Sequence, residues 1–97
     1  MNEMKQFFGA YFHQDWNLDV SDPDDVIRLF IGDGHSTSEL INLAEDIEKY
    51  AANKIDDDAA DEGLLRELGC YYIPNADGIG ARAWLNHVAK LLRATCE

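Results

Sequence analysis

The acidic side chains are the residues of this chain whose types and spacing come closest to a chemical motif. Calcium loops of the EF-hand type place oxygen ligands at alternate positions and a glycine at the sixth. A loop beginning at Asp56 would have Ala60 at a ligand position and Asp61 in place of the glycine, and one beginning at Asp15 would have Val20 there. We therefore expect no calcium site, and we expect helix capping and solvation as the ordinary role of these carboxylates.

Histidine and cysteine offer no better metal site. His13, His35 and His87 have no spacing typical of zinc ligands relative to Cys70 or Cys96. His13 stands among aromatic residues and is expected to be a hydrogen-bonded structural side chain. Two cysteines are too few for a disulfide scaffold, so we expect reduced thiols, with a bridge between them as the alternative.

Motifs for catalysis are also missing from the sequence. No serine stands in a nucleophile-elbow pattern, and Gly78-Ile79-Gly80 lacks both a preceding strand and the third glycine of a nucleotide-binding loop. Asp24 and Asp25 could in principle exchange protons, but the sequence indicates no cleft that would shift their pKa values. We expect no catalytic residue, no cofactor and no enzymatic activity.

The charge balance is the most unusual property of the chain. Its 97 residues include 19 acidic and 8 basic residues, a net charge of −11. Nucleic acids and anionic membranes are polyanions that proteins bind through Lys and Arg, so neither is expected as a partner. The absence of an apolar run after Met1 predicts no signal peptide, and we expect a cytoplasmic protein.

A cationic protein is the partner that this charge favours, because complementary charge speeds association and sets specificity. Two groups of acids could face it, with aromatic side chains as the anchors that a tight complex buries. The alternative for each acid is helix capping, and for each aromatic residue a place in the core. The predicted partner-binding residues are Asp15, Trp16, Asp19, Asp22, Asp25, Asp57, Asp58, Asp61, Tyr71 and Tyr72.

Capping residues and apolar periodicity predict the elements that hold these side chains. Ser36-Thr37-Ser38-Glu39 is a capping box, and the helix behind it, ending near Asn53, has a clear 3.6-residue period. We expect four further helices: one containing Met4 to Tyr11, one starting at Pro23 and ending at Gly32, one after Asp56 ending at Gly69, and one over 79–95. Short loops and no paired strands then give an all-α bundle of about five short helices, in a single domain over 1–97.

The aromatic segment 7–16 should supply the densest part of the core. It holds five aromatic residues, and each such side chain buries about 150–250 Å². The second helix is apolar on nearly every side and is expected to be largely covered. Leu64, Leu65 and Leu68 are expected to pack inward from the fourth helix, and an extended connector over 70–74 should place its tyrosines over the core.

The same N-terminal region carries a resemblance to a known family. Tyr11-Phe12-His13-Gln14-Asp15-Trp16, then Leu18-Asp19 and Ser21-Asp22-Pro23-Asp24-Asp25, is similar to the start of bacterial immunity proteins of contact-dependent growth inhibition (CDI) systems. The similarity is specific over about residues 7–31 and general beyond. It implies a helical protein that binds the toxin domain of its own system, often a nuclease, and blocks it without chemistry.

Charge and resemblance together lead to one functional hypothesis. We expect a monomer that forms a 1:1 complex with a cognate, basic nuclease toxin and occludes its active-site groove. The alternative is an acidic adaptor or regulatory module with no toxin partner. A small metal-binding protein is the third possibility.

Overall fold

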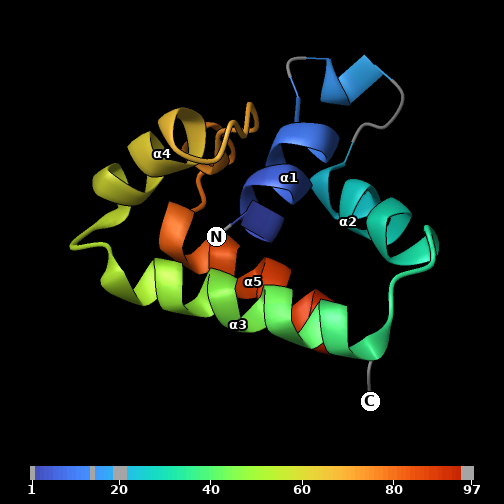
Figure 1. Cartoon of the computed structure of the whole chain (residues 1–97). Helices are drawn as coiled ribbons and strands as arrows, with labels where there is room; N and C mark the ends of the chain where they lie inside the picture. Colours follow the sequence, from blue (N-terminus) through green and yellow to red (C-terminus); the bar gives the residue numbers. More distant parts are fainter. Residues whose placement is uncertain (1, 14, 19–21, 95–97) are drawn as a thin grey trace.

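The computed structural model describes residues 2–13, 15–18 and 22–94. This part of the chain contains five α-helices, two short 3-10 helices and no strand. The α-helices are α1 (Asn2–Tyr11), α2 (Pro23–Gly32), α3 (Thr37–Asn53), α4 (Asp57–Arg66) and α5 (Ala81–Ala94), and the 3-10 helices are η1 (Trp16–Leu18) and η2 (Pro74–Asp77). The expected all-α fold is confirmed (Figure 1).

Three helices begin at side-chain caps that the sequence predicts. Asp22 accepts a 2.9 Å hydrogen bond from the Asp24 amide at the start of α2, and the Asp56 carboxylate accepts one of 2.8 Å from the Ala59 amide at the start of α4. Ser36 Oγ accepts a 3.2 Å bond from the Glu39 amide at the start of α3. Each cap satisfies a backbone donor that the helix cannot satisfy itself, which stabilises the element by about 1 kcal/mol.

Helices α3 and α5 form the most extensive helix pair, and α5 also contacts α2, α4 and η2. In Figure 1 the long α3 runs beside α5 along one side, with α1 above them and with α4 and α2 on opposite sides of α1. None of the helices in the described part of the chain combines the length and the apolar content needed to cross a membrane.

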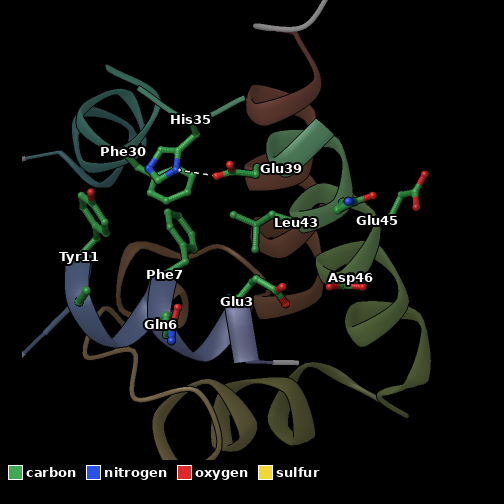
Figure 2. Close-up of a pocket in the computed structure, with 12 residues that line it drawn as sticks. Glu3, Gln6, Phe7, Tyr11, Phe30, His35, Glu39, Leu43, Glu45 and Asp46 are labelled. Atoms are coloured by element: carbon green, nitrogen blue, oxygen red, sulfur yellow. Dashed lines mark hydrogen bonds and ion pairs between the residues drawn. The ribbon is translucent and has the colours of Figure 1, made fainter. Parts of the chain in front are cut away.

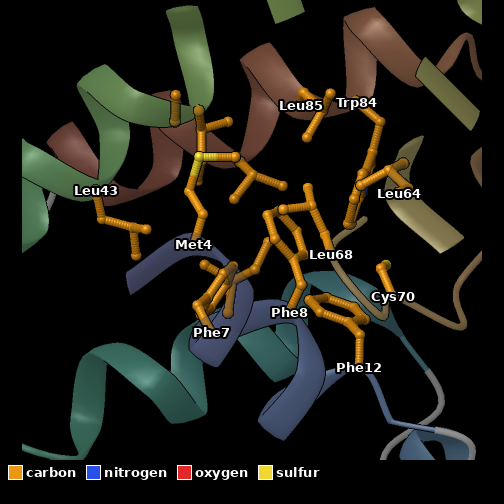
Figure 3. Close-up of a cluster of buried hydrophobic side chains, with 14 of the residues drawn as sticks. Met4, Phe7, Phe8, Phe12, Leu43, Leu64, Leu68, Cys70, Trp84 and Leu85 are labelled. Carbon is orange, nitrogen blue, oxygen red and sulfur yellow. The ribbon is translucent and has the colours of Figure 1, made fainter. Parts of the chain in front are cut away.

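The core is built around the aromatic side chains of the N-terminal segment, as the sequence predicts. Phe8 and Phe12 are fully buried, with ring centroids 5.9 and 5.4 Å from that of Trp84 on α5. Figure 3 shows Met4, Phe7, Phe8 and Phe12 meeting Trp84 and Leu85. Replacing one of these buried rings by alanine typically costs about 3–5 kcal/mol, so this cluster is a main source of stability.

Two expectations about burial are wrong: helix α2 is not largely covered, and Leu65 does not pack inward. Leu29 on α2 is 53% exposed and Leu65 on α4 is 44% exposed. Helix α2 packs through Val26, Ile27 and Phe30, and a ten-residue helix against one core leaves its opposite side in solvent. Leu65 follows the buried Leu64, and adjacent residues of a helix point about 100° apart.

Residues 70–73 form the expected extended connector, but only one of its tyrosines covers the core. Tyr72 is 5% exposed, whereas Tyr71 is 50% exposed, because successive side chains of extended backbone point to opposite sides. The Tyr71 amide donates a 2.8 Å hydrogen bond to the Phe12 carbonyl, which fixes the connector beside the end of α1. After it, Pro74–Asp77 form η2, which therefore includes the last residue expected in the connector, and Gly78 ends η2 with a φ of 75°.

Candidate functional site

Around the start of α2 the structure places the first group of predicted acids. Asp15 is exposed beside η1, Asp22 is the N-cap of α2, and Asp25 lies 2.7 Å from the guanidinium of Arg28. Asp19 lies outside the described residues. Asp25 therefore has a cation of its own, whereas Asp15 and Asp22 keep their carboxylates at the surface.

His13 is hydrogen-bonded, as expected from the sequence, although its side chain is exposed. Its Nδ1 accepts a 3.1 Å hydrogen bond from the Asp15 amide, so it helps to hold the turn that precedes η1.

Trp16 and Tyr72, both predicted as partner contacts, lie together although 56 residues separate them. Their ring centroids are 5.5 Å apart at an interplanar angle of 85°, an edge-to-face pair. Trp16 is half-buried against the core, and the buried Tyr72 also packs 4.9 Å from Trp84. Tyr72 thus belongs to the core, and Trp16 keeps one side accessible.

The Tyr72 hydroxyl opens onto a surface pocket of about 410 Å³, which we call the Tyr72 pocket. The hydroxyl donates a 2.8 Å hydrogen bond to Asp77 Oδ2. Burial raises the pKa of Tyr72 well above its ordinary value, with the bond to Asp77 and the negative charges of Asp77, Asp22 and Asp24 adding to it. The phenol therefore stays neutral. The pocket is lined by Asp22, Pro23, Asp24, Tyr72, Asp77, Ile79, Trp84 and His87.

Two further groups give the Tyr72 pocket hydrogen-bonding capacity. Nε2 of His87 lies 3.0 Å from Asp24 Oδ1, which joins α5 to α2. Nε1 of Trp84 is buried and has no hydrogen-bond partner among the described residues. Three carboxylates beside one imidazole make the pocket suited to a cationic side chain.

The second group of predicted acids, Asp57, Asp58 and Asp61, lies on α4 and takes no part in lining the Tyr72 pocket. In Figure 1, α4 and α2 lie on opposite sides of α1, so the two groups do not form one continuous cluster. We call these three residues the α4 acids.

Asp57 has a structural role within the α4 acids. Its Oδ1 accepts a 3.1 Å hydrogen bond from the Arg82 amide in the first turn of α5. Its carboxylate also lies against Gly80, where the carbon of the carboxylate would be 2.9 Å from an added Cβ atom. Asp57 thus joins α4 to the beginning of α5, and a side chain at residue 80 would disturb that contact.

Asp61 differs from its neighbours in its electrostatics. Partial burial raises the pKa of its carboxyl group, and the charges of Asp58 and Asp57 raise it further. Its Oδ1 is buried without a hydrogen-bond partner among the described residues. A cation brought to this surface would relieve that repulsion.

Metal binding finds no support in the side-chain geometry. In the described residues, no three or more His, Cys, Asp or Glu side chains are grouped as a metal ion requires. Cys70 is buried and its Sγ donates to the Tyr72 carbonyl at 3.5 Å, while Cys96 lies outside the described residues.

Sequence reasoning missed Asp77 and His87 as parts of a site. Asp77 stands in a segment whose sequence is typical of an ordinary turn, and His87 lies on the polar side of α5. The contact between His87 and Asp24 joins residues 63 positions apart, so no local pattern could have indicated it.

Comparison with known proteins identifies the family. Neither the curated proteins nor the solved structures gave a match. The family model described as CdiI immunity protein matches residues 1–92, nearly the whole chain. With this match and the all-α fold, the chain belongs to the CdiI immunity protein family.

Proposed function

We propose that this protein binds the toxin domain of its own CDI system and neutralises it by direct contact, without catalysing a reaction. The observation that carries the proposal is the family match over residues 1–92. The chain acts as a single domain over 1–97, in the cytoplasm, as a monomer that forms a 1:1 complex.

We further propose that the toxin is a basic nuclease and that the protein occludes its active-site groove. A nuclease must attract a polyanion, so its groove is positive. This chain has a net charge of −11, and the Tyr72 pocket gathers Asp22, Asp24 and Asp77 beside the buried Tyr72. The half-buried Trp16 packs against the Tyr72 ring from outside the pocket lining. The carboxylates take the place of substrate phosphates, and Trp16 and the exposed Tyr71 supply apolar contact area.

Binding to the toxin domain encoded directly upstream tests the proposal. The two proteins should co-purify, the complex should lack nuclease activity, and cells producing the toxin domain should grow only when this protein is present. A protein that neither binds that toxin nor protects the cells would instead be an adaptor with another partner.

Two variants with equal charge change test which surface is used. One replaces Asp22, Asp24 and Asp77 by Asn, which keeps the cap of α2 and the acceptor for Tyr72. The other replaces the α4 acids by Asn. We expect the first variant to bind at least about tenfold more weakly than the second. If the variant of the α4 acids binds more weakly instead, the contact with the toxin lies at α4.

A further inference from the structure

A second and larger hollow lies between α1, the end of α2 and the first half of α3. Its volume is about 620 Å³. It is lined by side chains from all three helices and by His35 in the loop between α2 and α3. We call it the α1–α3 groove, and Figure 2 shows the side chains that line it.

Aromatic rings form the inner wall of the α1–α3 groove. Phe30 lies at their centre, with the Phe7 ring 4.6 Å away and the Tyr11 ring 5.2 Å away, both edge-to-face. The His35 ring stacks on Phe30 at 4.0 Å with an interplanar angle of 21°. Tyr11 also donates a hydrogen bond to Asp33. These contacts hold the wall in one arrangement before any partner arrives.

Carboxylates surround this wall. Glu3 reaches the groove from α1, and Glu39, Glu45 and Asp46 reach it from α3, while none of its lining residues is Lys or Arg. Figure 2 shows Glu39 beside His35 and the other three acids toward the opposite side of the hollow. The groove thus combines an apolar wall with four carboxylates and has no lysine or arginine in its lining. Such a surface is complementary to a cation that has an apolar stem.

Glu39 holds the imidazole of His35 at the groove. Nδ1 of His35 lies 3.2 Å from Glu39 Oε2, and its Nε2 is buried with no hydrogen-bond partner within the described part of the chain. The Glu39 side chain itself is largely exposed.

We propose that the α1–α3 groove receives an arginine side chain of the toxin. Arginine fits because its planar guanidinium pairs with carboxylates in bidentate fashion and stacks on aromatic rings. Its aliphatic stem would cover the Tyr11 side of the wall. The proposal rests on the proposed function and adds a second anchor to it.

One toxin can reach both anchors. Helix α2 has ten residues and is about 15 Å long, with Asp22 capping its start and Phe30 near its end. An interface of ordinary size, about 800 Å² per partner, spans such a distance. The Tyr72 pocket and the α1–α3 groove therefore fit within a single complex.

The test uses an uncharged variant that fills the groove. Ala10 lines the groove and is exposed on α1, so Ala10→Leu should fold normally while occupying the space of the arginine stem. Ala52→Leu, at an exposed position near the end of α3 outside the groove lining, is the matched control. We expect A10L to weaken binding of the purified toxin domain at least about tenfold, and A52L to leave it unchanged. Circular dichroism melts verify that both variants are folded.

A charge variant tests the rim separately. Replacing Glu39, Glu45 and Asp46 by their amides removes three charges, as does the Asn variant of the α4 acids. The proposal is supported if the groove variant loses about tenfold more affinity for the toxin domain than the variant of the α4 acids does. Equal losses, or an A10L variant that binds like the wild type, overturn it. Failure of the wild-type protein to bind the toxin overturns the proposed function instead.

An arginine scan of the toxin domain identifies the occupant. One Arg→Ala toxin variant should lose affinity for the wild-type protein and lose nothing further against A10L. A lysine with that behaviour, or no such residue at all, contradicts the assignment to arginine.

Discussion

The hydroxyl of Tyr50 lies against the backbone of Gly63, in the space that a side chain at residue 63 would need. An added Cβ would be closer to this hydroxyl than atoms approach in proteins. The same hydroxyl donates a 2.6 Å hydrogen bond to Glu67, and Nζ of Lys54 donates to the same Glu67 oxygen at 2.8 Å. Gly63 therefore leaves room for the Tyr50 side chain of α3 beside α4.

Gly63→Ala should destabilise the protein, although alanine normally stabilises a helix interior by about 1 kcal/mol relative to glycine. The overpacked site should lower the free energy of unfolding by about 1–3 kcal/mol, which urea unfolding measures. Gly32→Ala is the control, because no atom lies within 4 Å of an added Cβ there. In a Tyr50→Phe background the cost of Gly63→Ala should fall sharply, and an unchanged cost would mean that the hydroxyl is not the obstacle.

The pair of Glu48 and Arg93 should make stability depend on pH. Arg93 donates two hydrogen bonds to Glu48, of 3.0 and 2.7 Å, which join α5 to α3. These bonds lower the pKa of Glu48 below its ordinary value of 4.5. A lowered pKa in the folded state stabilises the protein above the unfolded value, and this contribution is lost as the pH falls through the folded value.

Glu48→Gln should therefore cost about 0.5 kcal/mol at pH 7, since the pair is partly exposed. The difference from the wild type should vanish as the pH falls below 4.5. Unfolding curves at several pH values measure this. A difference that persists in acid would assign the effect to packing.

Cys70 should be unreactive in the folded protein. Burial raises the pKa of its thiol to about 12, so little thiolate exists at pH 8. In a Cys96→Ser variant, a thiol reagent should label the native protein far more slowly than the urea-unfolded protein. Rapid labelling of the native protein would show that the Cys70 region opens readily.

Association with the toxin should slow as salt rises. The acids of the Tyr72 pocket and of the α1–α3 groove act at a distance before contact, and salt screens them. Between about 10 and 150 mM salt we expect the association rate to fall by about tenfold or more, with a smaller change in dissociation. Stopped-flow mixing measures both, and a rate independent of salt would exclude electrostatic steering.

Much of the fold could be predicted from the sequence because its signals are local. The helix after Ser36 was predicted to its last residue, Asn53, since a capping box and a regular apolar period both mark it. The exposed side of α2 could not be predicted, because Val26, Ile27, Leu29 and Phe30 leave little polar face beyond Arg28 to orient the helix.

The candidate sites depend on contacts that no local pattern encodes. Trp16 beside Tyr72, and Asp24 beside His87, come together only through the packing of separate helices. The α1–α3 groove was missed for the same reason, because Glu3 and Asp46 lie on different helices. The sequence shows that these residues are acidic, but it does not show which residues of other helices lie beside them.

The position of α5 at the centre of the bundle has a consequence for synthesis in the cell. Trp84, Leu85, Val88 and Leu92 are buried against elements that precede them in the chain. While only the first four helices have left the ribosome, Phe8, Phe12 and Tyr72 lack the Trp84 ring against which they pack. If the proposed function holds, we therefore expect protection from the toxin to begin only once residue 92 has left the exit tunnel, and we expect a chain that ends before α5 to confer none.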